Sequence, residues 1–318
     1  MDTKVLNIDH SSGVLTAKQS AVVRTLLYFD IFQYPLTADE VQENCLEQKI
    51  PKTETDQILT HLASSGLVQR HENFYFINGT SELIPRRIDG NKRAEKYLQI
   101  ARRYTKIIST FPFVEAVFLS GSLAKGSVAE DGDIDYFIIT RPGRLWLCRT
   151  LLIAFKKVFL FNSHKYFCVN YFIDSNNLEV PDKNIFTATE LVFARPVYNK
   201  ELCKHFLESN SWSFSFYPNK LGIDLSKVQP LNNSLIKRLS EYLLNGRLGE
   251  KLDEYLFNLT LRHWKKKFNT FDETEFDLHM RSRKNVSKHH PNAFQQRVLK
   301  AHADKITAFE EQNKVQLT

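Results

Sequence analysis

Apolar and polar positions follow a helical period in some stretches of the chain and a two-residue period in others. Apolar residues recur at helical spacing over residues 21–32 and 53–65, and the capping-box sequence Thr37-Ala-Asp-Glu40 predicts a short helix between these two stretches. Residues 67–71 and 74–77 have the composition of short strands, and a polar turn joins them. The first 85 residues are therefore predicted to contain three helices followed by a β-hairpin.

A different order of elements is predicted after residue 85. Residues 86–109 contain no proline, and their apolar positions fall near helical spacing, which indicates a long connecting helix. Strand-like runs follow at 114–119, 134–139 and 166–173, and a helix is expected over 144–159 between the last two strands. Helices predominate from about residue 187 onward.

The whole pattern predicts an α+β fold with three consecutive domains. Residues 1–85 form the first domain. Residues 86–200 form a central domain in which a mixed sheet with flanking helices follows the connecting helix, and residues 201–318 form a helical C-terminal domain. A chain of 318 residues has the length for two or three domains.

Composition places the chain among ordinary globular proteins. With 42% hydrophobic and 25% charged residues and few Gly or Pro, it is neither collagen-like, a coiled coil nor disordered as a whole. The most apolar stretch, residues 145–161, is interrupted by Arg149, Lys156 and Lys157, so no membrane span is expected. The four cysteines are scattered without a metal-binding spacing, and no basic-then-apolar leader opens the sequence, so we expect a cytoplasmic protein.

Charge is distributed unevenly along the chain. Residues 1–85 carry 6 Lys and Arg against 11 Asp and Glu, a net charge of −5, whereas residues 86–200 have a net charge of +7 and residues 201–318 of +5. A basic surface suits a polyanionic ligand such as a nucleotide or nucleic acid, although a solvated basic face has the same composition. The most basic run, residues 279–300, contains six Lys and Arg and no acidic residue, which makes it a candidate for phosphate contacts with RNA or DNA.

One loop between two predicted strands carries the candidate chemistry. The strand over 114–119 runs into Gly121-Ser122, and the next strand opens with Asp133-Ile-Asp135. Residues two apart on a strand point to the same face, so the two carboxylates project side by side and repel each other unless a cation lies between them. Such oxygen ligands suit Mg²⁺ or Mn²⁺, while Gly121 permits close backbone approach and Ser122 offers donors to phosphate. These are the parts needed for metal-assisted nucleotidyl transfer.

Gly121-Ser122 followed by Asp133-Ile134-Asp135 resembles the signature of the polymerase β-type nucleotidyltransferase superfamily, in the spacing of its minimal and antibiotic-type members. The resemblance covers residues 114–174. It implies a nucleotidyltransferase-type mixed sheet in which Asp133 and Asp135 are the catalytic, metal-binding pair for Mg²⁺ or Mn²⁺. It also implies an NTP substrate held by Gly121, Ser122 and Lys125, and transfer of a nucleoside monophosphate to a hydroxyl acceptor, which is a small molecule, a protein or RNA.

The superfamily normally adds a third carboxylate from a later strand, and this chain departs from that pattern. Asn170 occupies the expected mid-strand position, but asparagine is neutral and is no general base. Asp174, on the same predicted face near the end of the strand, is the substitute candidate, so both residues are included in the catalytic set. Glu190 is a further candidate for which we expect a helix-surface or capping role. The departure leaves a second function open, a catalytically degenerate nucleotide-binding sensor or a regulator.

The regulator alternative depends on the first 85 residues, whose three helices and hairpin resemble a winged helix-turn-helix domain. The expected recognition helix, residues 53–65, contains no Lys or Arg and carries Glu54 and Asp56. Such a surface repels DNA phosphates. We therefore expect no DNA binding by the winged helix and favour the transferase over the regulator.

Overall fold

The computed structural model describes residues 13–231, 234–289 and 293–318, and in this part of the chain the fold is α+β with mixed sheets. The chain divides into two compact units, neither of which is one continuous segment. The first comprises the described residues up to Arg87 together with Phe214–Leu221 and Gln296–Thr318, and the second comprises Ile88–Ser213 and the described residues of Gly222–Gln295.

This division differs from the three consecutive domains predicted from the sequence. The break at Arg87 lies close to the predicted one at residue 85, but residues 201–318 do not form a unit of their own. Strand pairing gives the physical reason. Two late strands extend the sheet of the second unit, and the strand at 316–317 pairs with the strand at 14–15 in the first unit.

The first unit combines helices with two small sheets. Its helices are α1 (Ala17–Asp30), α2 (Ala38–Glu43), α3 (Lys52–Ser64) and most of α12 (Phe294–Asn313); its strands are β1 (Val14–Leu15), β2 (Leu36–Thr37), β3 (Gln69–His71), β4 (Phe74–Phe76) and β11 (Gln316–Leu317). The order β2-β4-β3 is antiparallel throughout, and β1 pairs in parallel with β11. Helix α1 begins four residues before the predicted position because Thr16 and Gln19 form a capping box there.

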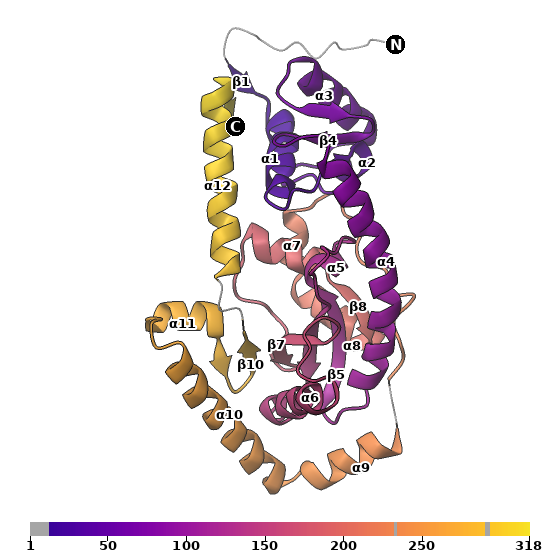
Figure 1. Ribbon diagram of the computed structural model, residues 1–318, viewed down its shortest axis with the longest axis vertical. Helices are drawn as coiled ribbons and strands as arrows, with labels where there is room; N and C mark the ends of the chain where they lie inside the picture. The colour runs from indigo at the N-terminus through magenta and orange to yellow at the C-terminus, as the bar shows by residue number, and fades with distance from the viewer. Residues whose placement is uncertain (1–12, 232–233, 290–292) are drawn as a thin grey trace. The chain divides into compact units, whose positions relative to one another are not determined.

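A six-stranded sheet of order β8-β5-β6-β7-β10-β9 forms the centre of the second unit (Figure 1). Its strands are β5 (Val114–Ser120), β6 (Asp135–Thr140), β7 (Cys168–Asp174), β8 (Arg195–Tyr198), β9 (Ser282–Arg283) and β10 (Val286–Lys288). Strand β6 pairs in parallel with β7, and the other neighbours in the sheet are antiparallel.

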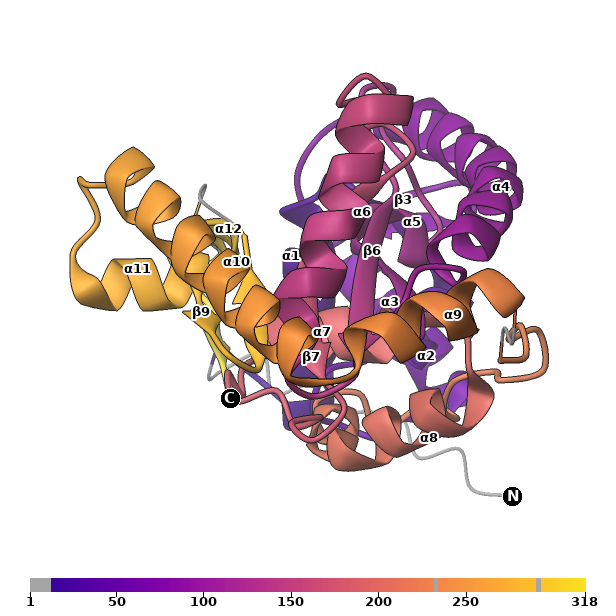
Figure 2. The same cartoon turned by 90° about the horizontal axis from the view of Figure 1, so that it is seen from below.

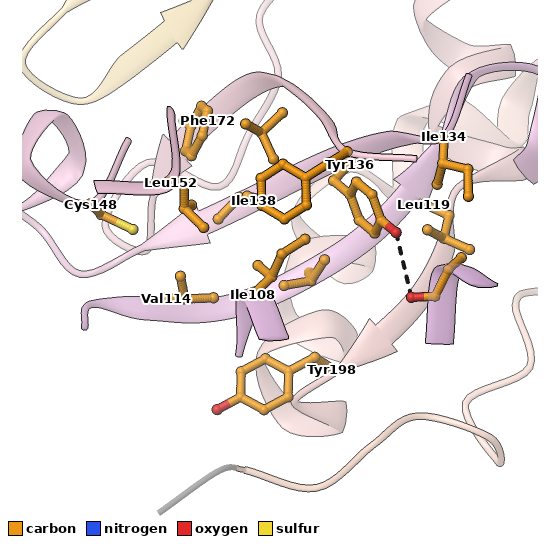
Figure 3. Close-up of a cluster of buried hydrophobic side chains, with 14 of the residues drawn as sticks. Ile108, Val114, Leu119, Ile134, Tyr136, Ile138, Cys148, Leu152, Phe172 and Tyr198 are labelled. Carbon is orange, nitrogen blue, oxygen red and sulfur yellow. Dashed lines mark hydrogen bonds between the residues drawn. The ribbon is translucent and has the colours of Figure 1, made fainter. Parts of the chain in front are cut away.

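Helices cover both faces of this sheet. The helices of the unit are α4 (Leu83–Ile108, from Ile88 onward), α5 (Gly121–Ala124), α6 (Leu145–Phe159), α7 (Ile185–Phe193), α8 (Lys200–Ser209), α9 (Leu235–Leu244), α10 (Arg247–Lys267) and α11 (Glu273–Met280). On one face α4 and α6 bury a cluster around Tyr136, whose hydroxyl donates to the backbone oxygen of Ala101 at 3.4 Å (Figure 3). On the other face α7 and α8 pack over Phe118 and Phe137. In the described part of the chain, no helix has the length and apolar character needed to cross a membrane.

Helix α9 is attached to the core through its polar side chains. The buried Lys237 ammonium donates to the backbone oxygens of Ser109 and Val114 at 3.2 and 2.7 Å, and Glu241 accepts the Phe113 N–H at 2.8 Å. Leu244 is half-buried against the core, while five large apolar side chains of the helix are more than 60% exposed: Leu235, Ile236, Leu239, Tyr242 and Leu243. Figure 2 shows α9 leading into α10 through a bend.

The N-terminus of α6 is capped by another helix. Its own N-cap residue, Arg144, makes no side-chain cap bond, whereas the Asp253 carboxylate of α10 accepts the Leu147 N–H at 2.8 Å. Burial raises the pKa of Asp253 despite these backbone donors. The cap therefore links two helices that are about 100 residues apart in sequence.

We predict that Asp253→Ala lowers the free energy of unfolding by about 1–2 kcal/mol, because it leaves buried N–H groups of α6 without an acceptor. Glu254→Ala is the matched control. Its carboxylate is exposed and pairs with the exposed Lys284, so the loss is expected to stay below about 0.5 kcal/mol. Urea unfolding followed by circular dichroism measures both variants, and equal losses would contradict the capping role.

Candidate functional site

The sequence motif folds into a tight turn at one end of the sheet. Strand β5 ends at Ser120, which pairs with Asp135 at the start of β6, so the loop between them leaves and rejoins the sheet at the same edge. Gly121 adopts a φ of +66°, a left-handed conformation that favours glycine. A Cβ atom at Gly121 would clash with the carboxylate of Asp135. The turn therefore places the Gly121 backbone directly against one of the two motif aspartates.

Asp135 is the most perturbed acid of this site. Its Oδ1 accepts a hydrogen bond from Asn170 Nδ2 at 2.9 Å, and Cys168 is its partner in the parallel β6–β7 register. Burial, and next the neighbouring Asp133 carboxylate, raise the pKa of Asp135 to about 7. Burial and the same two carboxylates raise the pKa of the Cys168 thiol above its usual range.

The ligand atoms of three residues come together here. One carboxylate oxygen of Asp133, one of Asp135 and the Cys168 sulfur all lie within 4.8 Å of one another. The two aspartates were predicted from the motif, but Cys168 was not, since its spacing from the other cysteines is not that of a metal site. The signal for Cys168 was its position two residues before Asn170, at the start of the strand that carries the expected third ligand.

Glu190 lies at this site, in contrast to the surface or capping role expected for it. It projects from α7, accepts the Gly121 N–H at 3.4 Å through Oε2, and forms an ion pair with Lys125. The Lys125 ammonium also lies 3.5 Å from the Gly121 carbonyl oxygen. Lys125, expected to contact phosphate, is thus near the site with a carboxylate as its partner, while Ser122 is an exposed residue of α5.

Asp174 is not placed to act as the third carboxylate. It ends β7 opposite Thr140, whereas Cys168 at the start of β7 lies opposite Asp135, and six residues of strand separate the two positions by roughly 20 Å. The carboxylate of Asp174 accepts the Asn176 N–H at 3.1 Å, which makes it part of a local turn. The structure therefore corrects this candidate and leaves Asn170 and Glu190 as the additional polar residues beside Asp135.

Lys156, which interrupts the apolar stretch 145–161, is a buried cation of α6. It is 5% exposed, and its ammonium is 3.3 Å from His164 Nδ1. Burial lowers the pKa of Lys156, and the charges of Cys168 and Asp133 partly oppose that effect.

Part of the basic run at 279–300 forms a strand next to β7, which composition did not predict. Strand β10 pairs with β7, and the His289 N–H donates to the Asn170 carbonyl oxygen at 3.0 Å. Most of its cations have acidic partners: Arg281 and Lys288 pair with Asp182, Arg283 with Asp277, Lys284 with Glu254, and Lys300 with Asp304. His290 of this run lies outside the described residues. Five of the six cations in this run thus form ion pairs, and the partners Asp182 and Glu254 come from other segments.

Comparisons with protein-family profiles, with curated proteins and with solved structures found no match.

We predict that Gly121→Ala damages the site beyond the cost of backbone strain. Gly143→Ala is the matched control, since Gly143 has a φ of +68° and no atom near its Cβ position. Both variants are expected to lose about 1 kcal/mol of unfolding free energy from the left-handed φ. Gly121→Ala is expected to lose more because the methyl group displaces the Asp135 carboxylate. Thermal unfolding of both variants measures the difference, and equal losses would show that the close approach to Asp135 does not matter.

The raised pKa of Asp135 predicts a pH dependence in the absence of metal. The native state holds the Asp135 proton more tightly than the unfolded state, so its contribution to stability is present at low pH and is lost as pH rises from about 4 to about 7. Asp135→Asn removes this loss, and its stability relative to wild type should rise across that interval. Urea unfolding in EDTA at several pH values tests this, with the exposed Asp131→Asn expected to run parallel to wild type. A constant offset for Asp135→Asn would refute the assignment.

Proposed function

We propose that this protein is a metal-dependent nucleotidyltransferase, which transfers a nucleoside monophosphate from an NTP to a hydroxyl group on a small molecule, a protein or RNA. One observation carries the proposal. Asp135, the first residue of β6, lies directly against the left-handed Gly121 turn that follows β5, and Asp133 precedes it by two residues outside the strand, so the two halves of the motif meet in space. The proposed resident ion is Mg²⁺ or Mn²⁺.

The donor set at the motif fits a divalent ion. Two carboxylates lie with ligand atoms within 4.8 Å of each other, and among the described residues neither forms an ion pair with Lys, Arg or His. Lys125, which lies 3.5 Å from the Gly121 carbonyl oxygen, pairs with Glu190 instead. A divalent ion held by Asp133 and Asp135 would neutralise the pair, bind the NTP phosphates and polarise the α-phosphate.

In the proposed reaction the acceptor oxygen forms a bond to the α-phosphorus, and the bond from that phosphorus to the leaving pyrophosphate breaks. The acceptor hydroxyl must release its proton to a base. Glu190 is the carboxylate in position for this role, since it contacts the Gly121 N–H next to Asp135, whereas the Asn170 amide accepts no proton. Lys125 then orients Glu190, and the Asn170 amide orients Asp135.

A nucleotide-binding sensor without transferase activity is the second candidate, and Asn170 favours it. Its amide lies 2.9 Å from Asp135, where a third carboxylate is expected in the superfamily that the motif resembles. In a sensor the site would bind the NTP with its cation and leave the α-phosphate intact. The two candidates differ in whether label is transferred, not in whether the nucleotide binds.

We predict that wild type binds ATP or GTP in the presence of Mg²⁺ or Mn²⁺ and loses at least tenfold in affinity in EDTA, because unscreened carboxylates repel the triphosphate. Asp133→Asn and Asp135→Asn should each abolish the cation-dependent part of binding. Isothermal titration calorimetry gives the affinities. The exposed Asp131→Asn lies in the same loop and is the matched control, with wild-type binding expected.

Transfer is measured in parallel with α-³²P-labelled NTP and a panel of hydroxyl acceptors, including the protein itself. Glu190→Gln should retain NTP binding and lose transfer by about 100-fold, as expected for removal of a general base, while Asp174→Asn should remain active. Binding without label transfer to any acceptor, in a wild type that is otherwise cation-dependent, would favour the sensor. Equal NTP affinity in Mg²⁺ and in EDTA would refute both candidates.

A further inference from the structure

We propose that the Cys168 thiolate is a third protein ligand of the divalent ion and makes the site selective for a thiophilic cation of the Zn²⁺ class over Mg²⁺. The proposal rests on the proposed function only in taking Asp133 and Asp135 as the metal-binding pair. It departs from the choice of Mg²⁺ or Mn²⁺ to which the carboxylates alone point. It also assigns a role to the one cysteine of the chain that is not buried in a core.

The backbone fixes the position of this thiol. Cys168 is the first residue of β7 and lies opposite Asp135 in the parallel β6–β7 register, so its side chain meets the carboxylate of its neighbour. The Cys168 sulfur lies within 4.8 Å of one carboxylate oxygen of Asp135 and one of Asp133. A sulfur that is near both carboxylates is positioned to share an ion with them.

The spacing of the three ligand atoms suits a single ion. Zinc binds sulfur at about 2.3 Å and carboxylate oxygen at about 2.0–2.2 Å, so in a tetrahedral site its ligand atoms lie about 3.3–3.6 Å apart. The Asp133 oxygen, the Asp135 oxygen and the Cys168 sulfur are all within 4.8 Å of one another, so side-chain shifts that close each separation by about 1.5 Å or less would bring them onto one ion. Three protein ligands leave a fourth tetrahedral position for a substrate oxygen or water, as in catalytic zinc sites.

The remaining neighbours favour sulfur as the third ligand over oxygen. The Asn170 amide points its nitrogen at Asp135 and cannot coordinate through that atom. Glu190 already accepts from Lys125 and from the Gly121 N–H. Thiolate ligands select Zn²⁺ and its neighbours at the end of the first transition row, while Mg²⁺ prefers oxygen alone. On binding, the thiol proton is released to the buffer and the sulfur–metal bond takes its place.

Co²⁺ is the probe for the test, because thiolate coordination gives it a near-ultraviolet charge-transfer band that oxygen ligands do not give. We expect the full chain to bind one equivalent of Co²⁺ with this band, and Zn²⁺ to displace it. Cys168→Ser should lose the band and weaken Zn²⁺ binding by at least tenfold, with Mg²⁺ binding changed less than twofold. Cys203→Ser is the control, since its hydroxyl can keep the bond that Cys203 donates to the Tyr198 carbonyl oxygen, and it should retain the band.

The outcomes separate this proposal from the function on which it rests. Co²⁺ binding that depends on Asp133 but shows no thiolate band would overturn the role of Cys168 and leave the two-aspartate metal site standing. If wild type binds none of Co²⁺, Zn²⁺ and Mg²⁺, both the role of Cys168 and the two-aspartate metal site are refuted. If Cys168→Ser does not fold, alkylation of Cys168 in wild type decides: Zn²⁺ should slow it at least tenfold and Mg²⁺ should not, and equal rates would refute coordination.

Discussion

The parallel pairing of β6 with β7 is the constraint on which the candidate site depends. It sets Cys168 beside Asp135 and introduces one extra residue on β7 between Val169 and Tyr171. That residue is Asn170, whose amide turns to the Asp135 carboxylate. Bulges commonly redirect side chains in this way. The antiparallel β5–β6 pairing then brings Gly121 against the same carboxylate, so a few backbone registers place every polar group of the site.

The sequence was sufficient for the local parts of this arrangement and insufficient for its long-range parts. Gly121, Asp133 and Asp135 were identified because they are close in sequence and follow a known spacing. Asp174 was chosen by strict two-residue alternation, which the bulge at Asn170 interrupts. Glu190 enters from α7 on the far side of the turn, and no periodicity indicates which side of a helix will meet a loop some 70 residues earlier. The units differ from the predicted domains for a related reason, since strand pairing does not follow sequence order.

Composition does not indicate which groups the charged side chains contact in two further segments. The run at 279–300 is basic as a sequence, but its described cations meet carboxylates such as Asp182, which come from other segments. Burial alone would raise the pKa of Asp182, yet Arg281 and Lys288 hold it below its usual value. In α9, Lys237 and Glu241 satisfy backbone groups of the core, while Leu235, Leu239 and Leu243 are exposed. In both segments, ion pairs or hydrogen bonds to residues distant in sequence determine where the charged side chains lie.

The pairing of β1 with β11 has a consequence for the order in which the molecule assembles. Ribosomes add about 5–20 residues per second, so Gln316 is made roughly 15–60 s after its strand partner Val14. During that interval β1 has no β11 to pair with. The strands β5 to β8 are by then available to pair with one another. The second unit therefore begins to assemble before the first is complete. For most of its synthesis, a nascent chain of this protein therefore lacks the strand with which Val14 and Leu15 pair.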